Sequence, residues 1–193
     1  MRVFRVVLLA VLLGSILQAQ TPVRSRTAVR LDQARLFEAA RFLNHASIGA
    51  THEEIVQAAG LGPDAWLERQ LALPITKHEP LTRQFRALVG PRGEDILHPT
   101  VMQRFAWWQQ TMTAEDVLRQ RVALALSEIL VVSNRVDILA LSPEAVSSYY
   151  DLLLEHAFGN YRDLLMGVTL HPAMGVYLSH INNARSDPAS GRF

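Results

Sequence analysis

The segment 118–178 limits what this chain can fold into more than any other part of the sequence. Its apolar residues recur at helical spacing, and start and stop signals divide it into separate helices. Ser142-Pro143 starts one helix, Asn160 caps the next, and His171-Pro172 starts a last short one. No stretch of the chain alternates between apolar and polar residues as a β-strand does. The sequence therefore predicts an all-α fold.

Similar signals continue the helical pattern towards the N-terminus. Residues 51–54 and 113–116 have the pattern of a capping box, and we expect the second one to start the longest helix, which ends at about Val132. A weaker helix is predicted at 80–89, with a stop at Gly90-Pro91 and a loop up to Pro99. Residues 122–132 are apolar apart from Ser127 and Glu128, which favours a helix buried on nearly all sides. We expect an irregular array of about eight to nine short-to-medium helices.

The first nineteen residues have the pattern of a signal peptide. Arg2 and Arg5 precede an apolar run at 6–17, and Ala19 offers a small residue at the cleavage position. An uncleaved membrane anchor is the alternative, although the run is shorter than the ~20 residues that a spanning helix needs. We therefore expect export to the periplasm or the extracellular space, and no transmembrane span in the mature chain. The expected organisation is a signal peptide (1–19), a flexible leader (20–30), a helical domain (31–181) and a disordered tail or truncated linker (182–193).

Composition excludes several classes of function. The chain has no cysteine, so disulfides, zinc thiolates, a thiol nucleophile and a lipoprotein anchor are impossible. Its 19 basic and 18 acidic residues nearly cancel. Because phosphate binding needs a basic surface, we do not expect a nucleic-acid partner.

Five sequence words occur in a fixed order along the chain. They are R-F-L-N-H-A-S-I-G-A-T (41–51), A-W-L-E-R-Q-L (65–71), L-R-Q-R-V-A-L-A-L-S-E-I-L-V-V-S (118–133), E-H-A-F-G-N-Y-R-D-L-L (155–165) and V-T-L-H-P-A-M-G-V-Y-L (168–178). Over about residues 35–181, the chain resembles the bacterial domain-of-unknown-function 1800 family. The resemblance implies an exported, mostly helical protein, often encoded beside a sulfatase-like exported protein that is a candidate partner. It brings no substrate, cofactor or catalytic residue.

Two departures from the family pattern affect this interpretation. Members usually continue for several hundred residues, through a block similar to P-D-E-N-Y-A-R-E-L-x-x-L-F-T-x-G, so we expect this chain to be the N-terminal portion of a longer protein. Another branch carries W-H-N-H-F at the place of residues 126–130, where Ser127 and Ile129 replace the two histidines. A role that depends on that histidine pair is therefore in doubt here.

Glu128 is the most informative single residue, because a carboxylate inside an apolar helix needs a partner. Arg121 precedes it by seven residues, nearly on the same helix face, and His156 and Arg162 are the other candidates. We expect these four residues to form a buried polar cluster. A structural ion pair, a catalytic acid or base and a metal ligand all remain open for Glu128.

The remaining polar residues do not assemble a catalytic or metal-binding motif. His156 and His171 lie at helix ends, where structural roles are expected, and no H-E-x-x-H pattern is present. Ser47 and Ser127 lack a G-x-S-x-G context. Two hypotheses follow. The first is a binding or structural module of the cell envelope or secreted fraction. The alternative is the N-terminal portion of an extracellular hydrolase-like enzyme that a missing C-terminal half completes.

Overall fold

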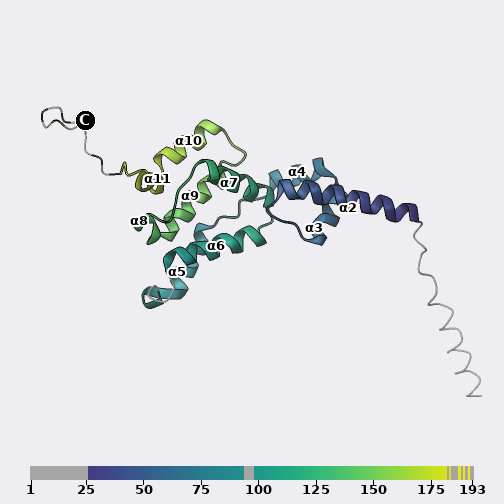
Figure 1. Ribbon diagram of the computed structural model, residues 1–193, viewed down its shortest axis with the longest axis horizontal. Helices are drawn as coiled ribbons and strands as arrows, with labels where there is room; N and C mark the ends of the chain where they lie inside the picture. The colour runs from purple at the N-terminus through teal and green to yellow at the C-terminus, as the bar shows by residue number, and fades with distance from the viewer. Residues whose placement is uncertain are drawn as a thin grey trace, which may run out of the picture. The chain divides into compact units, whose positions relative to one another are not determined.

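A computed structural model describes residues 26–93, 98–181, 183, 187, 189 and 191 of the chain (Figure 1). The regular structure of these residues consists of ten helices and no strand, which confirms the all-α prediction with a slightly higher helix count. The predicted signal peptide lies outside the described residues, as does most of the predicted tail. None of the described helices has the length and apolar character needed to cross a membrane.

The helices follow one another with short connections. In chain order they are α2 (Arg26–Ala46), α3 (His52–Leu61), α4 (Pro63–Ala72), α5 (Glu79–Gly93), α6 (Pro99–Thr113), α7 (Val117–Ile129), α8 (Asp137–Ala140), α9 (Pro143–Glu155), α10 (Tyr161–Leu170) and α11 (Pro172–Tyr177). The chain divides into two compact units, residues 1–37 and 38–193. The described part of the first unit is helical, and all packing below belongs to the second unit.

Local helix signals in the sequence are confirmed where they involve residues within one turn. Thr51 and Glu54 form the predicted capping box, with the Thr51 side chain accepting from Glu54 N and the Glu54 side chain accepting from Thr51 N. Asn160 caps α10 by accepting from the backbone of Arg162. The predicted start of α11 is also confirmed, because His171 is its N-cap residue.

Several helix boundaries differ from the prediction. The second capping box does not form, because α6 continues to Thr113 and α7 begins only after Asp116. Helix α7 also ends at Ile129 rather than near Val132, so it has 13 residues, and the longest helix is α2, with 21. Helix α5 continues past the predicted stop at Gly90-Pro91 and ends at Gly93. Helix α2 begins at Arg26, inside the predicted flexible leader.

The core of the second unit has two parts. The larger part surrounds α9, which contacts α5, α6, α7, α8, α10 and α11 (Figure 1). Its fully buried side chains include Leu139, Leu153 and Leu154. Complete burial of each such leucine stabilises the fold by roughly 1.5–3 kcal/mol. The smaller part lies between the end of α2 and helices α3 and α4, around Leu43 and Trp66.

Helix α7 does not bury the face that its sequence suggests. The prediction that it is buried on nearly all sides is wrong, because Ala125, Glu128 and Ile129 are exposed. Its buried residues are Arg119, Gln120 and Ala123. The polar part of this inward face lies against the segment between α4 and α5, where backbone groups need hydrogen-bond partners.

Candidate functional site

The four residues of the predicted buried cluster lie apart at the surface. Arg121, Glu128 and Arg162 are exposed, and His156 is half-buried as the C-cap residue of α9. Among the described residues, no hydrogen bond or ion pair joins any two of these four side chains. The prediction that Glu128 is buried is therefore wrong. The physical reason is that α7 ends at Ile129 and its last two residues are exposed, so that the Glu128 carboxylate keeps its contact with water.

A different polar cluster is buried, and it holds the segment between α4 and α5. We call Thr76, His78, Asp116, Gln120 and Asp151 the linker cluster. Asp116 Oδ2 accepts from Thr76 N at 3.0 Å, and Gln120 Nε2 donates to Thr76 O at 3.0 Å. The Asp116 and Gln120 side chains thereby satisfy both backbone groups of Thr76. The segment is fixed against α7 by directional bonds rather than by apolar packing alone.

Gln120 also fixes the protonation of the His78 ring. Its Nε2 faces two acceptors, Thr76 O and Asp116 Oδ1, so its Oε1 is the atom that faces His78. Nε2 of His78 lies 2.9 Å from this Oε1 and must carry the hydrogen that the bond needs. Burial lowers the pKa of His78, which keeps the ring neutral. With 1% of its surface exposed, His78 is out of reach of any ligand.

Asp151 anchors the other end of the linker cluster. This α9 residue accepts from His78 N at 2.7 Å and from Glu79 N at 3.0 Å, so it satisfies the first free donors of α5. Burial raises the pKa of Asp151 to about 6, although the two backbone donors and Lys77 act in the opposite direction. Both carboxylate oxygens are occupied by backbone groups, so the geometry is that of a helix cap supplied by a distant part of the chain.

A small cleft of about 280 Å³ lies beside Asp151, between α9 and the start of α11. It contains a serine and a histidine, because Ser148 Oγ lies 3.5 Å from His171 Nε2. His171 Nδ1 accepts from Ala173 N, so in the neutral ring Nε2 carries the hydrogen. Burial lowers the pKa of His171, which favours this neutral form. Ser148 itself donates to Ala145 O at 3.0 Å. His171 has no lone pair left for the serine proton, so this pair is not an activated nucleophile.

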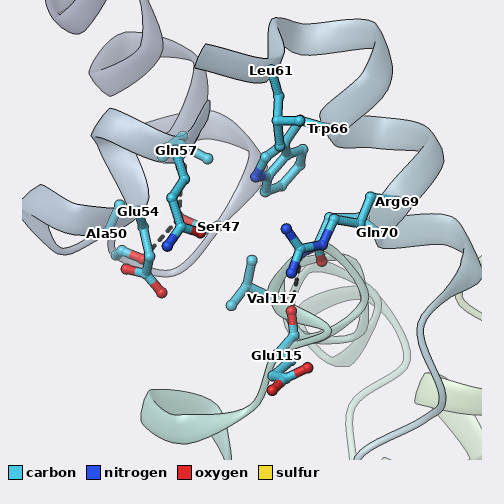
Figure 2. Close-up of a pocket in the computed structure, with 12 residues that line it drawn as sticks. Ser47, Ala50, Glu54, Gln57, Leu61, Trp66, Arg69, Gln70, Glu115 and Val117 are labelled. Carbon is cyan, nitrogen blue, oxygen red and sulfur yellow. Dashed lines mark hydrogen bonds between the residues drawn. The ribbon is translucent and has the colours of Figure 1, made fainter. Parts of the chain in front are cut away.

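Another cavity lies over the smaller part of the core (Figure 2). We call it the α3–α4 pocket. Its volume is about 290 Å³. Its lining comes from the end of α2, from α3 and α4, and from the start of α7: Leu43, Ser47, Gly49, Ala50, Glu54, Gln57, Leu61, Trp66, Arg69, Gln70, Glu115 and Val117. The pocket thus combines residues from four separate segments.

The floor of the α3–α4 pocket is apolar or already hydrogen-bonded. Leu43 and Trp66 are buried there. Ser47 donates to the carbonyl oxygens of Leu43 and Gly49. Gln70 donates to Glu115 O at 3.0 Å, the bond drawn in Figure 2, and accepts from Leu118 N at 3.2 Å. These bonds fix Ser47 and Gln70 in the walls of the pocket.

Charge is confined to the rim of this pocket. Glu54 is occupied by the capping box of α3, since its Oε2 accepts from Thr51 N. Figure 2 shows the Arg69 side chain extending from α4 towards the cavity, whereas the Glu115 carboxylate points away from it. Within the described part of the chain, the Arg69 guanidinium has no hydrogen bond or ion pair. An apolar floor with one available guanidinium is suited to binding rather than to proton transfer.

The family of the chain is identified by comparison with known families. Residues 41–189 match the family described as "Protein of unknown function (DUF1800)". The chain belongs to this family. No curated protein and no solved structure matches it. Among the residues described for this DUF1800 chain, no group of three or more histidine or acidic side chains is placed to hold a metal ion.

The sequence did not predict the residues that form the linker cluster and the pocket. Asp116 and Gln120 lie within five residues of Arg121 in the sequence. The apolar run that follows them led to the prediction of a buried Glu128 instead. One local signal was available: polar residues at 116 and 120 are four apart and share a helix face. Nothing local indicates Asp151 as the cap of a helix that begins more than seventy residues earlier.

Proposed function

We propose that this DUF1800 chain is the binding module of an exported protein and that the α3–α4 pocket takes its ligand. The observation that carries the proposal is the pocket itself, with Trp66 at its floor and an available Arg69 at its rim (Figure 2). Pockets of this kind bind through apolar contact and use a few polar groups to fix orientation. The two Gln70 bonds support this role, because they join the α4 wall of the pocket to the start of α7.

Export is supported by the N-terminal sequence alone. Arg2, Arg5 and the apolar run at 6–17 have the pattern of a cleaved signal. Expression of the full chain in a Gram-negative host should give a mature N-terminus near Gln20 in the periplasmic fraction, as read by intact-mass spectrometry. Recovery of protein that begins at Met1 in the cytosol alone would contradict this part of the proposal.

The hydrolase alternative needs an activated nucleophile or an acid–base pair that faces a cavity. The nearest arrangement, Ser148 with His171, has its proton on the wrong nitrogen. Asp151 has a raised pKa, but both of its oxygens cap α5. We therefore prefer binding to catalysis as the role of the described residues.

Binding at the pocket can be tested through the indole N–H signals of the protein. A 15N-labelled chain is screened by NMR with a panel of small fragments, and the signals of Trp66 and Trp108 are compared. Trp108 is exposed on α6 and does not line the pocket, so it is an internal control. We expect some fragments to shift the Trp66 signal in a saturable way and to leave the Trp108 signal unchanged.

Blocking the pocket provides the matched variants. Gln57 is an exposed residue of α3 at the pocket, and Gln57→Phe places a ring over its mouth. Val56→Phe adds the same ring to the neighbouring exposed position, which does not line the pocket. Binding should be lost in the first variant and kept in the second. If no fragment shifts the Trp66 signal, or if both variants bind equally, the pocket is not the binding site.

A further inference from the structure

We infer that the α3–α4 pocket takes a ligand in which one carboxylate lies next to a compact apolar group, with the carboxylate bound by Arg69. This inference rests on the proposed function and adds the chemical class of the ligand.

Arg69 is the charged group that the pocket offers to a ligand. Oε2 of Glu54 accepts from both the backbone N–H and the hydroxyl of Thr51. The Glu115 carboxylate points away from the cavity, and its backbone oxygen is bonded to Gln70 (Figure 2). Arg69 extends towards the cavity and has no partner among the described residues. A ligand group that pairs with Arg69 carries a negative charge.

A carboxylate fits this guanidinium better than a polyanion does. The planar fork of an arginine pairs with the two oxygens of a carboxylate in a bidentate way. Glu54 and Glu115 also line the pocket, and their negative charges disfavour a second negative charge on the ligand. A single carboxylate satisfies Arg69 without adding to this repulsion.

The floor determines what accompanies the carboxylate. Trp66, with 7% of its surface exposed, lies there with Leu43 and Val117. The hydroxyl of Ser47 and the amide of Gln70 are bonded within the protein, so they attract few polar groups of a ligand. A volume of about 290 Å³ admits a compact branched or short-chain apolar group rather than a long lipid tail. The C-terminus of a peptide that ends in an apolar residue and a free short-chain acid share this chemistry.

The test compares acids with their neutral esters. N-acetyl-leucine represents a peptide terminus and hexanoate represents a free acid; their methyl esters keep the apolar group and lose the charge. Titrations follow the Trp66 indole signal of the full chain. We expect each acid to bind about tenfold more tightly than its ester, as a charge-assisted pair at a partly exposed site allows. Tighter binding of N-acetyl-leucine or of hexanoate then identifies which source the pocket prefers.

Two arginine variants separate the role of Arg69 from general charge effects. Arg69→Gln should abolish the preference for acids, whereas Arg121→Gln, at an exposed helix position away from the pocket, should keep it. Because Arg69 lies in the last turn of α4 and also favours that helix end, a thermal melt checks that Arg69→Gln remains folded.

The outcomes of this test and of the fragment screen are distinguishable. If esters bind as tightly as acids, or if Arg69→Gln keeps the preference, the carboxylate inference is overturned while the pocket remains a binding site. If neither acids nor esters shift the Trp66 signal, the inference is also overturned, and the fragment screen decides on the pocket by itself.

Discussion

Asp151 leads to a prediction about how the stability of this protein depends on pH. Its side chain is buried, with 5% of the residue's surface exposed, and it accepts from His78 N and Glu79 N. Burial disfavours the charged form, whereas the two backbone donors and Lys77 favour it. Burial is the largest effect, and it raises the pKa of Asp151 from 3.8 to about 6. The replacement Asp151→Asn removes the titration and keeps the shape.

The sign of the effect follows from the raised pKa. Because the folded state binds the Asp151 proton more tightly than the unfolded state does, this group stabilises the fold most below about pH 4. Its contribution falls as the pH rises through about 6 and is constant above that. A change in pKa from 3.8 to about 6 corresponds to ~3 kcal/mol in the free energy of unfolding.

The assay is urea-induced unfolding followed by far-ultraviolet circular dichroism, from pH 4 to pH 7.5. The free energy of unfolding is measured for the unaltered chain and for Asp151→Asn. We expect the value for the unaltered chain minus the value for the variant to fall by ~3 kcal/mol between about pH 4 and pH 6.5. Asp64→Asn is the control, since Asp64 is an exposed carboxylate of α4. A difference that stays flat, or that rises with pH, would show that the backbone donors outweigh burial and would refute the reasoning.

Three further replacements test separate parts of the fold by thermal and urea unfolding. Gln120→Met keeps the shape but leaves the Thr76 carbonyl and the His78 N–H without partners, which should destabilise the protein by ~2–4 kcal/mol; an unchanged stability would mean that water replaces the amide. Gly62→Ala should destabilise by ~1–3 kcal/mol because φ is 81° and ψ is 162° there, whereas Gly60→Ala, inside α3 with open space around it, should stabilise by up to ~1 kcal/mol. Lys77→Ala removes an ion pair to the half-exposed Glu155 and should change stability by less than ~1 kcal/mol.

The parts of the fold that could be predicted depend on residues close together in the chain. The capping box at Thr51, the cap at Asn160 and the helix start at His171 each need atoms from one helical turn. The all-α class follows from the spacing of apolar residues along segments of ten or more residues. The apolar residues of these segments form the larger part of the core. The four-residue helix α8 was missed, because a single turn has no periodicity to detect.

The orientation of α7 could not be predicted, because periodicity does not identify the neighbour that a helix face meets. Residues 122–132 are apolar apart from Ser127 and Glu128, yet the face that is buried carries Arg119 and Gln120. The deciding partner is Thr76, about forty residues earlier in the chain, whose backbone groups cannot remain unpaired in the interior. The apolar content of residues 122–132 therefore predicted a buried carboxylate at Glu128, whereas the buried carboxylate of this region is Asp116.

The start of α7 connects the pocket to the rest of the second unit. Gln70, in the wall of the α3–α4 pocket, bonds to Glu115 O and Leu118 N at one side of this helix start. Asp116 and Gln120, on the same turn, bond to the linker that leads to α5. Hydrogen bonds fix a geometry more narrowly than apolar contacts do, since they lose their strength within small changes of distance and angle. Loss of the Gln120 amide should therefore weaken ligand binding at the pocket as well as stability. Loss of the Asp151 carboxylate, at the far end of the linker cluster, should lower stability and leave binding nearly unchanged.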